Sequence, residues 1–202
     1  MPKIVALACS PSKGFNSDTM LDAFLAGISE IKEVKVEKIY LNDVEMQNYN
    51  FLIRLPDVAK EPQLVALIDK IVSADGLVVA TPCFNFGVPA ALKNLLDRMS
   101  YKALNPKSLN WLSQPKGLLT NLHNFYLVSC GTPGWMVRVF LWPIFPVNWL
   151  RVVFGYFGSK TWGGIYGAGL NTNNLAKNNP KLLEWCRKAG RGYAQRLVKL
   201  LA

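Results

Sequence analysis

Residues 76–98 read GLVVATPCFNFGVPAALKNLLDR, and this stretch contains a strand, a loop and the start of a helix. Residues 76–80 are apolar without interruption, which is typical of a strand buried on both faces in the middle of a parallel sheet. Pro89 favours a helix start, because the first helical turn does not use the N–H that proline lacks. The apolar residues after it that share one helical face are Ala90, Leu92, Leu95, Leu96 and Met99. The stretch therefore predicts one β-α unit with a stiff loop inside it.

The rest of the chain repeats this alternation of strand and helix. Further apolar or alternating stretches predict strands over 3–8, 34–41, 125–130 and 161–166. Apolar residues at helical spacing predict helices, namely one capped by Ser17 or Asp18, one over 63–73 and one from about Lys181. The segments 42–60 and 100–124 are predicted as connections. Such alternation predicts an α/β fold in which helices cover both faces of a parallel sheet.

Five strands fit the flavodoxin-like order 2-1-3-4-5, with the 202 residues forming a single domain. No G-x-G-x-x-G follows the first strand, which disfavours a dinucleotide-binding Rossmann domain. The first residues, MPKIVALACSPS, contain too short an apolar run for a signal peptide, and we expect a cytoplasmic protein.

Composition excludes several classes of protein and site. Half of the residues are hydrophobic and 18% are charged, which indicates a globular chain. The four cysteines, at 9, 83, 130 and 186, form no C-x-x-C, and His123 is the single histidine. We therefore expect no metal centre, and we expect reduced, individually buried thiols.

Charge is divided unevenly along the chain. Residues 1–100 carry 10 Lys and Arg and 12 Asp and Glu, whereas residues 101–202 carry 13 basic residues and one acid, Glu184. This pattern suits an acidic partner, a membrane surface or a polyanionic ligand, and equally a solvated basic face. A nucleic-acid partner is not expected, because no binding motif is present and the aromatic residues cluster in one apolar block.

Ligands in such sheets bind beyond the carboxyl ends of the strands, where three loops carry polar or flat side chains. Residues 10–17 (SPSKGFNS) offer hydroxyls, an amide and a lysine at a helix start, which suits a phosphate or an ordinary capped turn. Residues 81–89 place Phe84 and Phe86 where they can contact a planar ring or cap the core. Residues 129–134 (SCGTPG) are small and leave room for a planar ligand.

The first two loops resemble the NADPH-dependent FMN reductase family of flavodoxin-like proteins, most specifically over 81–98. The resemblance covers roughly residues 1–133. It implies that the FMN phosphate is held by Ser10, Ser12, Lys13, Asn16 and Ser17. It implies that the flavin ring lies along Thr81, Pro82, Cys83, Phe84, Asn85, Phe86 and Gly87. It implies that the far side of the ring is closed by Ser129, Gly131 and Thr132.

The same resemblance implies an activity and partners. The expected enzyme transfers electrons from NAD(P)H through FMN to a small acceptor such as a quinone or a free flavin, and assembles as a homodimer or tetramer. Flavin N5 carries the hydride, so no catalytic protein residue is expected. Alternatives are an FMN electron-transfer protein that takes electrons from a protein partner, and a ligand sensor. The acceptor and the choice between NADH and NADPH are not predicted.

Two departures and two single residues qualify the resemblance. Many members carry arginine where Ser12 stands, which leaves the phosphate charge to Lys13. Residues 42–60 contain no cysteine, so the iron–sulfur centre of a related branch is excluded. Cys83 is expected to be a packing residue more than one that tunes the flavin. His123 precedes a strand, at the wrong edge of the sheet for catalysis.

Residues 135–158 (WMVRVFLWPIFPVNWLRVVFGYFG) form the apolar block. Two arginines and two prolines argue against a membrane-spanning helix. Three interpretations stay open: a core helix with a subunit interface, a hydrophobic groove over the flavin for an apolar acceptor, or peripheral contact with a membrane surface.

Overall fold

A parallel sheet forms the centre of the protein, in a computed structural model that describes the chain except residues 50–59, 111, 138 and 140–145. Its five strands lie in the order β2-β1-β3-β6-β7. Their bounds are β1 (Lys3–Ala8), β2 (Lys35–Tyr40), β3 (Gly76–Pro82), β6 (His123–Ser129) and β7 (Lys160–Gly167). Every neighbouring pair is parallel. The predicted flavodoxin-like order 2-1-3-4-5 is confirmed, with β6 and β7 as the fourth and fifth strands of this sheet.

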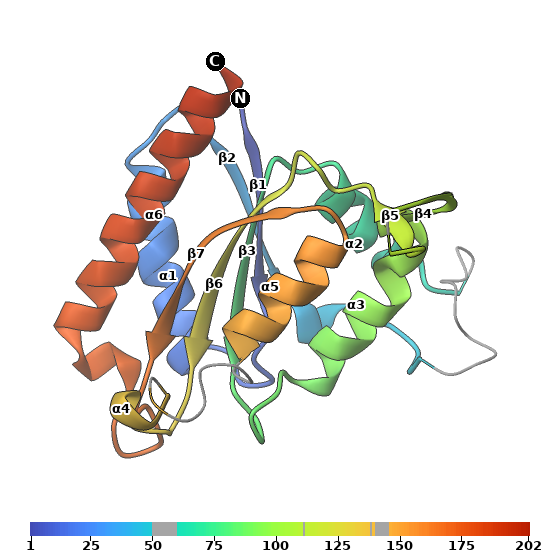
Figure 1. Cartoon of the computed structure of the whole chain (residues 1–202). Helices are drawn as coiled ribbons and strands as arrows, with labels where there is room; N and C mark the ends of the chain where they lie inside the picture. Colours follow the sequence, from blue (N-terminus) through green and yellow to red (C-terminus); the bar gives the residue numbers. More distant parts are fainter. Residues whose placement is uncertain (50–59, 111, 138, 140–145) are drawn as a thin grey trace.

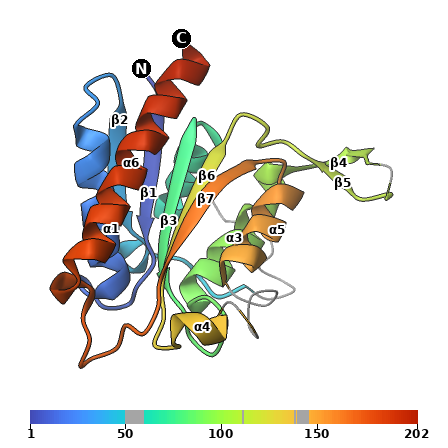
Figure 2. The same ribbon diagram turned by 60° about the vertical axis from the view of Figure 1, so that its left-hand side comes forward.

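Helices cover both faces of the sheet and complete three layers (Figures 1 and 2). One face carries α1 (Asn16–Ser29) and α6 (Pro180–Leu201). The other carries α2 (Pro62–Val72), α3 (Ala90–Ala103) and α5 (Pro146–Tyr156). Three short elements sit in connections: η1 (Leu41–Asp43), α4 (Gly134–Met136) and η4 (Ala176–Asn178). The layered architecture predicted from the strand–helix alternation is therefore present.

Strand β3 explains why the central sequence is apolar throughout. Leu77 and Val79 lie in the core cluster under α2, α3 and α5, whereas Val78 and Ala80 lie in the cluster under α1 and α6. Because side chains alternate between the two faces and helices cover both, residues 76–81 of this strand are all buried. The continuous apolar run therefore follows from its central place.

Helices α1 and α6 approach each other closely through glycine. A Cβ atom at Gly190 of α6 would lie 2.0 Å from the carbonyl oxygen of Phe24 in α1. Such a contact is far inside the van der Waals distance, so a larger residue at 190 would push the helices apart. Met20, Phe24 and Ile28 of α1, which share one helical face, are buried.

Two local predictions are wrong. Neither Ser17 nor Asp18 is the N-cap, because α1 already begins at Asn16 and Phe15 occupies the cap position. The predicted connection 100–124 is too long, because α3 continues to Ala103 and the antiparallel hairpin of β4 (Leu104–Leu109) and β5 (Pro115–Gly117) follows it. Its turn is held by the side-chain oxygen of Asn110, which accepts hydrogen bonds from the N–H groups of Leu112 and Gln114 at 2.9 and 3.0 Å.

The apolar block 135–158 contributes residues to two helices, α4 and α5. Helix α5 begins at Pro146, the helical position that best tolerates proline, and buries Leu150 and Phe154 against the sheet. Residues 138 and 140–145 of the block, and residues 50–59 of the predicted connection 42–60, lie outside the described residues. Among the described helices, none has the length and hydropathy needed to cross a membrane.

Candidate flavin-binding site

The three predicted loops meet at one edge of the sheet. Residues 9–15 follow β1, residues 83–89 follow β3 and residues 130–133 follow β6, so all three lie at the carboxyl ends of neighbouring strands. Figure 1 shows these loops gathered at the lower end of the molecule, below the arrowheads of the strands. The arrangement is the one in which open parallel sheets bind ligands.

The first loop is tied down through Ser10. The N–H of Ser12 donates to Ser10 Oγ at 3.1 Å, and Asn42 Nδ2 donates to the Ser10 carbonyl at 3.1 Å. Lys13 does not point into the loop, because its Nζ lies 2.6 Å from Asp43 Oδ2 in an exposed ion pair. Exposed pairs contribute about 0–1 kcal/mol, so an anion in the loop can compete for this lysine.

The start of α1 offers donors at the end of that loop. The N-cap residue Phe15 gives no side-chain hydrogen bond, so the N–H groups of the first turn are available to an anion. Ser17 is buried in this turn. Asn16 is buried as well, and its Oδ1 accepts a hydrogen bond of 2.8 Å from the N–H of Ala176. Asn16 therefore also anchors the segment that follows β7.

Asp18 and Lys38 form a buried charge pair beneath the loop. Asp18 Oδ1 lies 2.6 Å from Lys38 Nζ, and Asp18 Oδ2 accepts from the N–H of Gly14 at 2.6 Å. Gly14 has a φ of 71°, a conformation that favours glycine. Burial alone lowers the pKa of Lys38, but its hydrogen bonds to Asp18 and Asp22 raise it overall. The lysine thus stays charged and offsets a carboxylate that would otherwise repel an anion at this helix end.

The second loop forms a tight turn of unusual conformation. Phe84 and Gly87 exchange two backbone hydrogen bonds of 3.0 and 2.9 Å. Asn85 and Phe86 between them have φ values of 48° and 65°, both in the left-handed region. That region is uncommon for asparagine and strained for phenylalanine, by about 1–3 kcal/mol. Phe84 and Phe86 are both about half exposed, so the strained turn presents two aromatic rings to the space beyond the strands.

The third loop is fixed between β3 and β7. The Ser129 carbonyl accepts from the N–H of Cys83 at 2.8 Å, and the N–H of Cys130 donates to Gly167 at 2.9 Å. Ser129 is buried, Gly131 is exposed, and the carbonyl of Thr132 accepts from the N–H of Gly169 at 2.9 Å. Small residues therefore stand where the third loop faces the second.

Cys83 and Cys130 are the first residues of the second and third loops, and the expectation of individually buried thiols is wrong for Cys83, which is only partly buried and packs with Cys130. Both thiols pack with Tyr166 of β7 in one small cluster. Burial raises the pKa of the Cys130 thiol to about 11 and also raises the pKa of the Cys83 thiol. Both are therefore protonated at neutral pH and unsuited to nucleophilic attack. Thr81 and Pro82 are the last residues of β3, and the Thr81 hydroxyl donates to the Pro82 carbonyl at 3.0 Å.

His123 lies at the other edge of the sheet. It is the first residue of β6, it is 4% exposed, and its ring centroid lies 4.3 Å from that of Trp162. Burial lowers its pKa. Within the described part of the chain, no three His, Cys, Asp or Glu side chains are placed to hold a metal ion.

The segment after β7 also closes the site, and the sequence did not predict this. The N–H of Ala176 donates to Asn16 at the start of α1, and the N–H of Gly169 donates to Thr132 of the third loop. A run of asparagine and glycine, GAGLNTNN over 167–174, marks a turn but gives no sign of its partners. Asn42, after β2, was likewise missed.

These residues fit a flavin mononucleotide. The uncapped start of α1 with its hydroxyl side chains suits a phosphate, and the strained turn with Phe84 and Phe86 lies one strand away, where a planar ring would extend. The Asp18 carboxylate in the first turn of α1 is paired with Lys38, so it does not face a phosphate there as an unpaired charge.

Comparison with known proteins points in the same direction. A sequence profile of the family described as NADPH-dependent FMN reductase matches residues 2–119. An FMN-dependent NADH:quinone oxidoreductase of Mycoplasma genitalium is 31% identical over 169 residues, which cover 77% of this chain and 78% of that protein. One of the same name from Thiobacillus denitrificans is 37% identical over 92 residues, 46% of this chain and 42% of that protein.

The fold has solved counterparts. The structure of an NAD(P)H:quinone oxidoreductase from Methanothermobacter marburgensis superimposes with a TM-score of 0.71 and 20% identity, over 96% of this chain and 98% of that one. At this identity the likeness concerns the fold. The profile match, the relative from Mycoplasma genitalium and the loops described above together show that this chain belongs to the NADPH-dependent FMN reductase family.

Proposed function

We propose that the protein is an FMN-dependent oxidoreductase that transfers electrons from NADH or NADPH to a small acceptor, with a quinone as the preferred class. The observation that carries this proposal is the convergence of the uncapped start of α1 with the strained aromatic turn 84–87 at one sheet edge. The relatives named as FMN-dependent NADH:quinone oxidoreductases support the donor, the cofactor and the acceptor.

Each loop has a separate role in this proposal. Ser10, Ser12 and Ser17, together with the first-turn N–H groups of α1, bind the phosphate, and Lys13 leaves Asp43 to join them. When bound, FMN supplies reversible two-electron chemistry at N5. The turn with Phe84 and Phe86 orients the ring, and the third loop excludes water from its other side.

The chain supplies position and electrostatics in place of a nucleophile. The Cys83 and Cys130 thiols are protonated, because burial raises the pKa of both. His123 lies at the amino end of β6, a whole strand away from the loops. The proposed reaction therefore needs no protein acid–base pair.

The test is a visible spectrum of the purified protein, followed by separate additions of NADH and NADPH without oxygen. We expect flavin bands that bleach with at least one nucleotide and recover when a quinone is added. Bands that persist with both nucleotides would instead favour an electron-transfer protein with a protein donor. A colourless protein that does not take up added FMN would contradict the proposal.

A variant pair locates the phosphate site. Ser17→Ala removes a hydroxyl at the start of α1, and Ser29→Ala removes one at the exposed end of the same helix. A hydrogen bond to a charged group contributes about 1.5–3 kcal/mol, so Ser17→Ala is expected to weaken FMN binding by about tenfold or more. Ser29→Ala is the matched control. Equal FMN affinity in both variants would place the phosphate elsewhere.

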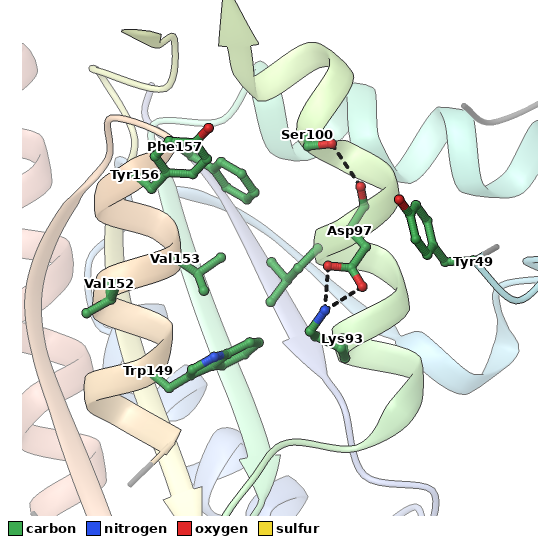
Figure 3. A pocket seen from close by; sticks show the side chains of 10 residues that line it. Tyr49, Lys93, Asp97, Ser100, Trp149, Val152, Val153, Tyr156 and Phe157 are labelled. Carbon is green, nitrogen blue, oxygen red and sulfur yellow. Dashed lines mark hydrogen bonds and ion pairs between the residues drawn. The ribbon is translucent and has the colours of Figure 1, made fainter. Parts of the chain in front are cut away.

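A homodimer or tetramer is part of the proposal, supported by a groove between α3 and α5 whose α5 side is apolar and whose α3 side carries Lys93 and Asp97 (Figure 3). Its volume is about 560 Å³, and Trp149 and Val153 of α5 point across it toward α3. Val152 and Tyr156 of α5 remain exposed beside it. Sedimentation should show a dimer or larger assembly that Val152→Asp weakens and Leu200→Asp, on exposed α6, does not. A monomeric native protein would contradict this.

The cytoplasmic location also stays a prediction, to be tested by cell fractionation.

A further inference from the structure

A second cavity, of about 550 Å³, lies at the carboxyl end of β7. Figure 1 shows α4 below the ends of β6 and β7, beside the start of α6, and residues of α4, β7 and α6 line the cavity. None of the eight lining residues is charged. They are Gly134, Trp135, Val137, Val139, Gly164, Tyr166, Ala168 and Trp185. The volume lies within the range of small-molecule sites, and the lining is that of an apolar ligand.

The cavity adjoins the proposed flavin site. Tyr166 and Ala168, which line it, pack in one cluster with Cys83 and Cys130 of the second and third loops. Gly134 is two residues from Thr132 of the third loop. A molecule that reaches the loops from this side therefore lies along the cavity.

The mouth of the cavity exposes large apolar side chains to water. Trp135 is 63% exposed, Val139 67% and Trp185 53%. Lys181 and Lys188 line a neighbouring hollow together with Trp185, so the charged groups nearest to Trp185 belong to that hollow and not to the cavity lining. Exposed apolar residues that line one cavity mark a place where an apolar partner is removed from water.

We propose that this cavity is a subsite for the hydrocarbon tail of the electron acceptor, so that the preferred substrates are lipophilic quinones with an extended apolar side chain. The inference rests on the proposed function, since the quinone ring would lie beside the flavin that the loops are proposed to hold, while its tail occupies the cavity. A free flavin nucleotide or a nicotinamide nucleotide is a poor occupant, because each carries charged phosphate groups and none of the lining residues is charged.

The magnitude follows from the burial of methylene groups. Each buried methylene contributes about 0.8 kcal/mol, or about fourfold in affinity. A decyl chain that places only a few of its methylenes in the cavity should therefore lower KM by at least about tenfold relative to a methyl group. The protein's preference for the longer chain is the measurable consequence.

The experiment compares a methyl-substituted and a decyl-substituted benzoquinone with the FMN-loaded protein and two variants. Val139→Asp introduces a charge at the mouth of the cavity, and Trp185→Ser removes an aromatic wall. Both sites are exposed, so both variants are expected to fold. Leu200→Asp, at the exposed end of α6, is the control. A redox-inert decyl-substituted dimethoxybenzene, titrated by calorimetry, reports binding without activity.

The native protein and Leu200→Asp should favour the decyl quinone, whereas both cavity variants should raise its KM by about tenfold and leave the KM of the methyl quinone within about twofold. Equal KM values for the two quinones in the native protein would overturn the subsite, as would variants that affect both quinones alike. Binding to phosphatidylglycerol vesicles without binding of the inert probe would also overturn it, in favour of a lipid-surface contact.

If neither quinone is reduced, the proposed function fails, and the inert probe alone decides on the cavity. Binding that Val139→Asp weakens by about tenfold or more supports the subsite. Absent binding, or binding that Val139→Asp does not change, overturns it.

Discussion

A buried ion pair joins Arg98 of α3 to Glu61, the residue directly before α2. The side chains are 0% and 2% exposed. Arg98 also donates to the carbonyl of Gln47 at 2.9 Å, and Glu61 accepts from the N–H of Gln47 at 2.7 Å. The pair thus fastens the chain after η1 to α3, and the substitution Glu61→Gln would leave the arginine charge buried without its carboxylate.

The expected cost is large. Removing one partner of a buried pair costs about 3–5 kcal/mol, because the remaining charge stays desolvated and loses that partner's attraction. In a domain of this size each kcal/mol lowers Tm by about 2–4 °C, so Glu61→Gln should lower Tm by about 6–20 °C. Urea unfolding, followed by circular dichroism and tryptophan fluorescence, measures the change in free energy directly.

The matched control is Glu37→Gln. Glu37 pairs with Lys70 at 2.5 Å, but both side chains are about half exposed. Exposed pairs contribute about 0–1 kcal/mol, so this variant should be almost as stable as the native protein. If Glu61→Gln lowers the free energy of unfolding by less than about 1 kcal/mol, the argument is refuted. The arginine charge would then be compensated by other groups or by water despite its burial.

Three further predictions concern strain, packing and pH. Phe86→Gly should stabilise the FMN-free protein by about 1 kcal/mol in urea unfolding, because glycine relieves the φ of 65°; a loss of stability would contradict the strain. Gly190→Ala should destabilise the protein by about 1–3 kcal/mol. Gly192→Ala in the same helix should stabilise it by about 0.5–1 kcal/mol, because a Cβ atom at 192 meets nothing within 4 Å. Equal effects of the two substitutions would refute the close approach of α1 and α6. Burial lowers the pKa of His123, so the unfolded chain takes up the proton first and stability should fall as pH drops below about 6.5. His123→Gln should show a smaller fall between about pH 7.5 and pH 5.5, and an identical fall would assign it to other groups.

The sequence predicted the sheet because its signals are local and strong. The run 76–80 is apolar throughout since β3 is covered on both faces, and Pro89 precedes a helix that begins at Ala90. The three loops were found for the same reason, since each directly follows a predicted strand. The resemblance over 81–98 then predicted FMN as the ligand at the carboxyl ends of the strands, a position that followed from the strand order.

The parts that were not predicted depend on contacts between distant residues. The hairpin of β4 and β5 has no alternating apolar pattern, and its base is fixed where Leu119 donates to Phe157 of the chain after α5 at 2.8 Å. Phe15 takes the cap position because Asp18 binds Gly14 and is not itself the cap. The role of Asn16 as an anchor requires Ala176, 160 residues away.

The two halves of the chain contribute differently to the proposed enzyme. The family profile ends at residue 119, and it contains the loops proposed to hold the phosphate and to orient the ring. The third loop, α4 and both tryptophans of the cavity, Trp135 and Trp185, lie beyond that point. In this arrangement the cofactor is bound mainly by the part that the family shares, while the acceptor is chosen by the later part, which the profile does not describe. The acceptor is therefore better inferred from the cavity of this chain than from the family to which it belongs.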